Sequence, residues 1–159
     1  MNPADKKLRE RFHGMHGLVL RLDATSPKHG VTISNETGRL STPVTLDPEN
    51  VGTQIYTNNA MPIPKTVSAT WREGDFKRNE GGPWVGGTII GDYTVPVAER
   101  IPDSILDYIR KNGGALRVKI RLKDDGVLIG WDVEEWYTTQ YGRGLRWVLP
   151  GGDFLDTKY

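Results

Sequence analysis

The residues from 116 to 123 constrain the fold more than any other segment, because their side chains alternate between apolar and basic types. The segment runs Leu-Arg-Val-Lys-Ile-Arg-Leu-Lys. A period of two places the apolar side chains on one face of a β-strand and the basic ones on the other. A second segment with the same period follows and carries apolar Ile129, Trp131 and Val133. The two segments are therefore predicted to pair as an antiparallel hairpin.

The pattern of charges selects the register of this hairpin. With Asp125-Gly126 as a two-residue turn, apolar residues face apolar ones and basic residues face acidic ones. The predicted pairs are Leu122 with Ile129, Ile120 with Trp131, Val118 with Val133, Lys119 with Asp132, and Arg117 with Glu134. A slip by one residue would place apolar side chains opposite charged ones at every position. Only Arg121 and Lys123 lack an acidic partner across the hairpin, so the prediction is a largely neutral scaffold.

Charge and composition exclude several classes of protein. The 21 basic and 20 acidic residues give a net charge of +1, so nothing favours general binding to nucleic acid or to an anionic membrane. The chain has no cysteine, which excludes thiol nucleophiles, cysteine-ligated zinc, iron–sulfur clusters and disulfides. Its 159 residues suffice for one domain with a core of its own. We expect a charged segment or tether over residues 1–16 and a single β-rich domain over 17–159.

Periodicity also predicts most of the remaining elements. Strands are expected over 17–23, 53–57, 65–72 and 88–97. A short helix is expected after Pro102, with an apolar stripe formed by Ile105, Leu106 and Ile109 and with Gly113 as its cap. The pattern does not assign the pairing of residues 24–51. The predicted fold class is α+β and β-rich, with an antiparallel, sandwich-like sheet that carries one short helix.

Three further regions are predicted to turn or to lack regular structure. The run from Gly74 to Gly87 holds five glycines and is expected to form a long hairpin loop or flap that would serve as a contact loop. An aromatic C-terminal hairpin is expected to turn at Gly142-Arg143-Gly144. The polar residues 151–159 are expected to fray.

Patterns that would indicate catalysis or metal binding are weak. The candidates are His13, His16 and His29 and the carboxylate pairs Asp124-Asp125 and Glu134-Glu135. No nucleophile elbow accompanies the histidines, and turn chemistry and ion pairing explain the carboxylates better than glycoside hydrolysis does. We therefore assign no catalytic residue, no metal site and no cofactor, and we expect that the chain is not an enzyme.

Aromatic residues offer the best candidates for a contact surface. Trp71 and Trp131 fall on inward faces of predicted strands and are assigned to the core. Other aromatic residues lie in or near predicted loops, and aromatic and arginine side chains are common anchors of protein interfaces. The predicted partner-binding residues are Trp84, Tyr141, Arg143, Arg146 and Trp147.

The order of several short motifs resembles a known family. The chain carries Met61-Pro62-Ile63-Pro64, then a strand that ends in Trp71-Arg72, then Tyr93 to Val97, an Ile-Pro helix, and the hairpin from Leu116 to Trp131. This series, over about residues 55 to 135, resembles small exported lipoproteins of proteobacteria, some of which are immunity proteins against phospholipase effectors of type VI secretion.

The resemblance implies a periplasmic inhibitor, often lipid-anchored, that binds and occludes a toxic lipase and has no catalysis of its own. The sequence given carries neither an export signal nor a lipid-accepting cysteine, so a membrane tether would have to come from a removed N-terminal anchor. Two other functions stay open. One is a sugar- or peptide-binding module, and the other is a small hydrolase that uses Asp or Glu with an N-terminal histidine.

Overall fold

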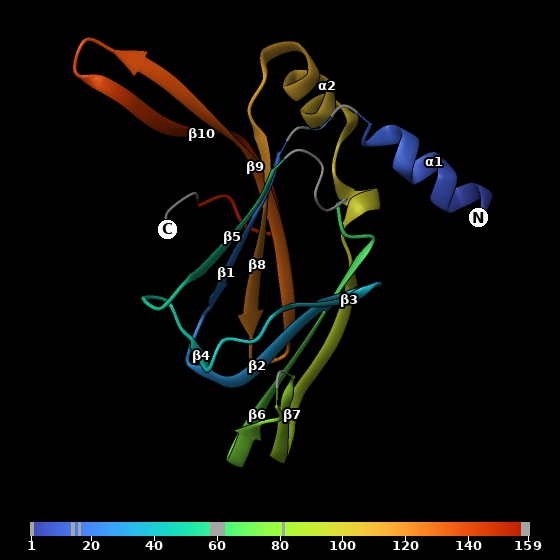
Figure 1. Cartoon of the computed structure of the whole chain (residues 1–159), viewed down its shortest axis with the longest axis vertical. Helices are drawn as coiled ribbons and strands as arrows, with labels where there is room; N and C mark the ends of the chain where they lie inside the picture. The colour runs from blue at the N-terminus through green and yellow to red at the C-terminus, as the bar shows by residue number, and fades with distance from the viewer. Residues whose placement is uncertain (1, 14, 16, 58–62, 81, 157–159) are drawn as a thin grey trace.

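The chain folds into two β-sheets, of which one carries the predicted hairpin. The computed structural model describes residues 2–13, 15, 17–57, 63–80 and 82–156. Sheet A has the strand order β10-β9-β8-β1-β5, and sheet B has the order β3-β2-β6-β7 with β4 paired to β2 (Figure 1). The strands are β1 Gly17–Ala24, β2 Lys28–Asn35, β3 Gly38–Ser41, β4 Thr45–Leu46, β5 Gly52–Thr57, β6 Thr66–Arg78, β7 Trp84–Pro96, β8 Ala115–Lys123, β9 Gly126–Thr139 and β10 Gly142–Gly152. The β-rich α+β class predicted from the sequence is confirmed.

The direction of one strand pairing departs from the prediction. The predicted sheet was antiparallel throughout, whereas β1 and β8 are parallel neighbours. Ninety residues separate these two strands in the sequence, so no local turn pattern could indicate their direction. The other pairings within the two sheets are antiparallel.

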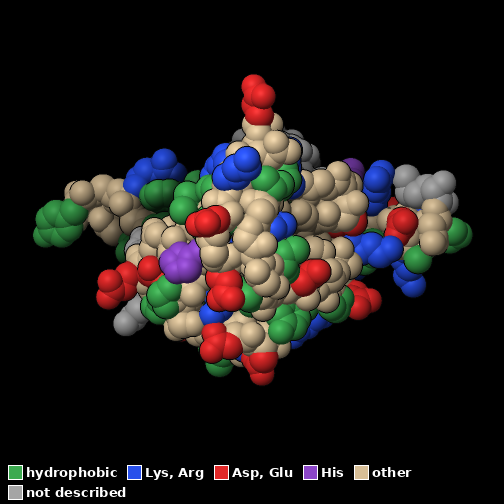
Figure 2. All heavy atoms as spheres, turned by 90° about the horizontal axis from the view of Figure 1, so that it is seen from below, with side chains coloured by type: hydrophobic (Ala, Val, Ile, Leu, Met, Phe, Trp, Pro, Cys, Tyr) green, Lys and Arg blue, Asp and Glu red, His purple; other side chains and the backbone are tan. Residues whose placement is uncertain are grey.

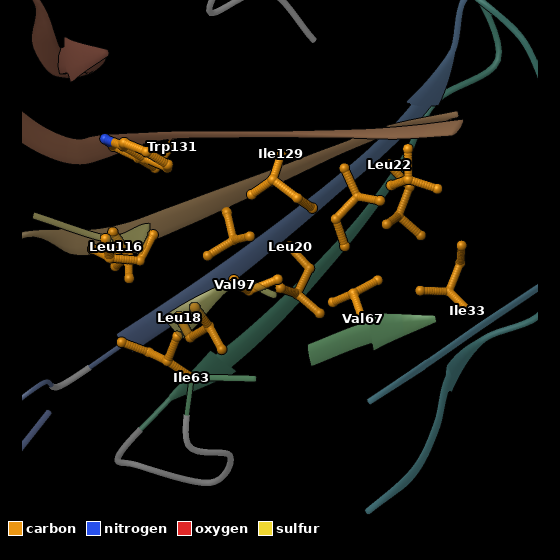
Figure 3. Packing of buried hydrophobic residues seen from close by; sticks show 14 of the residues in the cluster. Leu18, Leu20, Leu22, Ile33, Ile63, Val67, Val97, Leu116, Ile129 and Trp131 are labelled. Carbon is orange, nitrogen blue, oxygen red and sulfur yellow. The ribbon is translucent and has the colours of Figure 1, made fainter. Parts of the chain in front are cut away.

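The apolar faces of the two sheets enclose the core. Leu18, Leu20 and Leu22 on β1 lie beside Leu116 and its neighbours on β8 (Figure 3). The facing sheet contributes a second buried set, which consists of Val31, Ile33, Val67, Ala69 and Trp71. The burial of Trp71 and of Trp131 confirms their assignment to the core.

Helix α2, Asp103–Asn112, closes part of this core. Its buried side chains are Ile105, Leu106 and Ile109, which are the predicted stripe. The helix ends at Gly113, whose positive φ of 81° suits glycine and whose N–H donates to the Ile109 carbonyl at 2.8 Å. A short 3-10 turn, η1 Ala98–Arg100, precedes the helix. No described helix is long and apolar enough to cross a membrane.

The N-terminal segment forms a helix that is held against the body. Helix α1 spans Pro3–Arg11, and the Asn2 side chain caps it by accepting from the Ala4 N–H at 2.9 Å. Arg11 donates to Asp103 at 2.7 Å and to the Ala98 carbonyl at 2.7 Å. The charged segment expected over residues 1–16 therefore includes a helix that is held against the body.

The β8–β9 hairpin has the predicted faces but a different register. Asp124 and Asp125 form the turn, and Lys123 pairs with Gly126, so each residue of β8 faces a residue two positions earlier than predicted. Because the shift is by two residues, every side chain keeps its face. Arg117 therefore lies opposite Asp132 instead of Glu134.

The basic side chains of β8 are matched by acids on the outer face of sheet A, which is the face away from the core. Arg117 donates through Nε to Asp132 at 2.7 Å, and Lys119 Nζ lies 3.4 Å from the same carboxylate. Arg121 has no partner on β9 and instead donates to Asp23 of β1 at 2.8 and 2.9 Å. The acidic partner of Arg121 therefore comes from β1, the parallel neighbour of β8, and not from the hairpin itself.

The glycine run from Gly74 to Gly87 is not a flap. Strands β6 and β7 continue through it, and only residues 79–83 connect them. The register shifts between Glu73 and Phe76, where Gly74, Gly86 and Gly87 have positive φ. A Cβ on Gly87 would lie 2.3 Å from the Glu73 carbonyl oxygen. The glycines are needed for β-bulges inside a long hairpin, which corrects the sequence prediction.

The polar tail is docked as far as residue 156, which is a second correction. Beyond the end of β10, residues 153–156 cross the outer face of sheet A, and we call them the strap. Asp153 accepts from Arg100 at 2.7 and 3.0 Å and from the Ile129 N–H at 2.9 Å. Asp156 accepts from Arg121 at 2.7 and 2.9 Å. Charge pairing therefore holds a segment whose polarity predicted fraying, while residues 157–159 of that predicted segment lie outside the described residues.

The stability that the docked strap contributes to the fold should depend on pH. Hydrogen bonds from Arg100 hold the pKa of Asp153 below its ordinary value, and Arg121 does the same for Asp156. A carboxylate whose pKa is lowered by folding stabilises the fold above its unfolded pKa and loses that contribution as pH falls through the folded pKa. We expect Asp153→Asn to lower the thermal midpoint at pH 7, and the difference to shrink below about pH 4. An equal difference at pH 7 and at about pH 2.5 would contradict this ion-pair account.

Candidate functional site

The hairpin of β9 and β10 projects from the body as a two-stranded arm. Strand β8 begins at Ala115, opposite Glu134, so beyond this point β9 pairs only with β10 in the described part of the chain. We call residues 135–146 the arm, which extends to the upper left in Figure 1. In the view from below, the projection on that side ends in hydrophobic side chains (Figure 2). An isolated two-stranded ribbon is only marginally stable. The presence of exposed apolar side chains on the arm is therefore not explained by a contribution to folding stability.

One face of the arm continues the outer face of sheet A. Trp136 lies there with 60% of its surface exposed, and the Arg143 guanidinium stacks over its ring at 5.0 Å. Trp147 lies nearer the body on the same face, where its Nε1 donates to Glu134 at 3.0 Å. Its ring also packs 4.6 Å from the Arg117 guanidinium, so Trp147 joins the arm to the body.

The other face of the arm is fastened to helix α2. Arg146 stacks over Tyr137 at 5.4 Å and donates to Glu135 at 2.8 Å. Glu135 also accepts a hydrogen bond from the Tyr108 hydroxyl of α2. The hydrogen bond from Tyr108, with a further one from Arg146, holds the pKa of Glu135 below its ordinary value. The base of the arm is therefore anchored by a charged carboxylate.

The tip of the arm carries its most exposed aromatic side chain. The turn is formed by Gln140 and Tyr141, because Thr139 pairs with Gly142. This corrects the prediction of a turn at residues 142–144. Thr139 Oγ accepts from the Tyr141 N–H and donates to the Gly142 carbonyl, both at 3.1 Å. Tyr141 is 91% exposed.

The structure brings together four of the five predicted partner-binding residues. Tyr141, Arg143 and Arg146 lie on the arm and Trp147 at its base, but Arg143 and Arg146 are on opposite faces. Trp84 lies elsewhere, at the start of β7, and is only 8% exposed. Its prediction rested on the supposed flap, so the indole of Trp84 is not presented to a partner.

Two exposed residues of the arm, Trp136 and Tyr137, were not among the predicted contacts. Both lie near the predicted C-terminal turn, but the sequence does not show that β8 begins only opposite Glu134. The absence of that third strand at this point leaves them uncovered.

The other sequence candidates are engaged locally or lie apart. His13 lines a shallow hollow with Arg9 and Glu10, and the His29 ring is 2.9 Å from Thr45 Oγ. His16 lies outside the described residues. Asp124 pairs with Lys28, and Asp125 lies 3.2 Å from Lys123 Nζ. Within the described ranges, no group of three or more His, Asp or Glu side chains is arranged to hold a metal ion.

Comparison with known protein families, with curated protein sequences and with solved structures finds no significant match for this chain. The fold and the site define a β-rich α+β protein with a projecting arm that displays aromatic and arginine side chains.

Proposed function

We propose that this chain is a binding protein that grips another protein through its arm. The observation that carries the proposal is the exposure of Trp136, Tyr137 and Tyr141 on a ribbon that leaves the body. Large aromatic side chains and arginine supply most of the binding energy at protein interfaces. The arm places them on both faces and at the tip, which suits insertion into a cleft better than contact with a flat surface.

The charges of the arm support a partner with acidic groups around an apolar cleft. Glu134 and Glu135 are engaged by Trp147 and by Arg146 with Tyr108, whereas Arg143 lies exposed over Trp136. Residues 136–145 include no Asp or Glu. An exposed guanidinium that has no acidic residue on its own stretch of ribbon favours a carboxylate on the partner.

The finer proposal follows from the family resemblance of residues 55 to 135. On this basis the partner is a secreted antibacterial lipase-type toxin, the chain is its immunity protein in the bacterial periplasm, and inhibition is steric. The arm would occlude the entrance to the toxin's active site, and the chain itself would contribute no catalytic group.

Charge reversal on the arm tests this function. We expect Arg143→Glu to weaken a one-to-one complex with the toxin encoded beside this gene by at least about tenfold. The free energy of unfolding should change by no more than about 0.5 kcal/mol, because Arg143 is exposed. The measurement is calorimetric titration, together with inhibition of the toxin's lipase activity.

The matched control is Lys77→Glu, an exposed site on β6 at the other end of the molecule. It should bind and inhibit like the unaltered chain. Equal binding by both variants, or no complex with the unaltered chain, would argue against the proposed function.

A further inference from the structure

The strap lies on the outer face of sheet A as a bound peptide would. Its Asp156 carboxylate forms a two-point contact with the Arg121 guanidinium, and the Asp156 carbonyl accepts from Lys119 Nζ at 2.8 Å. The ring of Phe154 covers the same two cations, at 4.0 Å from Arg121 and 5.0 Å from Lys119. An aromatic ring and a carboxylate two residues apart thus engage one pair of basic side chains.

The receiving surface is formed by side chains of sheet A, which hold the two cations from the side opposite the strap. Asp23 orients Arg121 through two hydrogen bonds, and Asp132 lies 3.4 Å from Lys119 Nζ. Gly130 leaves room for the strap to pass, because a Cβ there would lie 2.9 Å from the Phe154 carbonyl oxygen. Lys119 is fully buried beneath these groups, and burial lowers its pKa, which Asp132 opposes. Cations oriented in this way are a preorganised site for an acidic segment.

The part of β10 that leads from the arm to the strap contains a local backbone irregularity. The register of β10 shifts between Val148 and Gly151, and Leu149 has a φ of 55°, in the left-handed region that costs a residue with a side chain free energy. Pro150 follows and has no N–H to donate.

We propose that the outer face of sheet A around Lys119 and Arg121 is a peptide-binding site, and that the strap fills it at rest. The site takes an extended segment with an aromatic residue followed two positions later by a carboxylate. A segment of this kind on a partner competes with the strap. The proposal does not depend on the function of the arm.

The test uses a strap that no longer competes. The probe is an acetylated peptide with the sequence of residues 154–159, titrated into the Phe154→Ala/Asp156→Ala variant. Binding is followed through the backbone amide signals of Lys119 and Arg121 in NMR spectra. We expect the variant to bind the peptide at least about tenfold more tightly than the unaltered chain, whose site is occupied in cis. A control peptide with alanine in place of its Phe and Asp should not bind.

The receptor side is tested by adding Arg121→Gln to the same variant, which should abolish binding. Equal affinity of the variant and the unaltered chain, or equal binding of the control peptide, would overturn the proposal. If circular dichroism shows that the double variant does not fold, Asp156→Asn takes its place, because it removes the charge and keeps the shape. The same comparisons then support or overturn the proposal.

Discussion

Replacing Asp132 by asparagine is expected to lower the free energy of unfolding by about 3–5 kcal/mol, which is typical when one partner of a buried ion pair is removed. The carboxylate is completely buried and contacts both Arg117 and Lys119, which are 2% and 0% exposed. Asparagine keeps the volume and removes the charge. Two cations would then stay on the buried outer face of sheet A without the carboxylate that offsets their desolvation.

Urea unfolding at pH 7 measures this effect, and Asp125→Asn is the matched control. The Asp125 carboxylate also faces a lysine, Lys123, but its side chain is 82% exposed and the pair lies in a turn. An exposed ion pair contributes about 0–1 kcal/mol, so the control should unfold nearly like the unaltered chain. A similar small loss for Asp132→Asn would show that the charges on this face are not matched as the structure describes.

Replacing Trp84 by alanine is expected to lower the free energy of unfolding by about 3–5 kcal/mol. The indole packs edge-on against Phe76, with ring centroids 5.4 Å apart, and lies beneath the Arg78 guanidinium at 4.4 Å. These contacts lie at the end of the β6–β7 hairpin that is next to its connection. Loss of the ring would leave a cavity between the side chains of Phe76 and Arg78.

Trp84→Phe separates packing from hydrogen bonding. The buried Nε1 of Trp84 has no hydrogen-bond partner in the described part of the chain, so removing it relieves an unsatisfied donor. The phenylalanine variant should therefore unfold within about 1.5 kcal/mol of the unaltered chain. Chemical denaturation of both variants makes the comparison. If Trp84→Ala kept full stability, Trp84 would be a surface residue, as its placement in a flap predicted.

The faces of the strands could be predicted because a period of two does not depend on register. The apolar residues between 116 and 122 point to the core, and the basic residues between 117 and 123 point away from it. These faces were predicted correctly although the turn was placed one residue too late. The choice between Asp124-Asp125 and Asp125-Gly126 depends on local turn energies that a glycine preference does not settle. The acidic partner of Arg121, Asp23, lies on β1. The parallel pairing of β1 with β8 joins strands that are distant in the sequence, so no local sequence pattern could predict it.

The glycine run at 74–87 and the strap were both predicted wrongly, and for the same reason: the structure of each depends on contacts that composition does not reveal. Gly74, Gly86 and Gly87 adopt positive φ in bulges of a regular hairpin, and glycine serves a bulge and a loop equally well. The strap is polar, yet Arg100 and Arg121 hold it from distant parts of the chain. In both regions the amino-acid composition gives the type of each residue, whereas the local conformation depends on the residues that the fold brings into contact with it.

The candidate site was predicted in part. Tyr141, Arg143 and Arg146 were chosen for their chemistry, and the structure places them on one ribbon. Their distribution over two faces depends on the turn at Gln140 and Tyr141, which the glycines at 142 and 144 obscured. The exposure of Trp136 depends on where β8 begins, and this is a property of a neighbouring strand.

Hydrogen–deuterium exchange of the free chain and of its complex with the toxin tests the central claim most directly. If the arm is the contact surface, amides of residues 136–145 should exchange more slowly in the complex, and those of the β6–β7 hairpin near residues 79–83 should not change. Slowed exchange at the β6–β7 end or over the strap, with the arm unchanged, would contradict the claim.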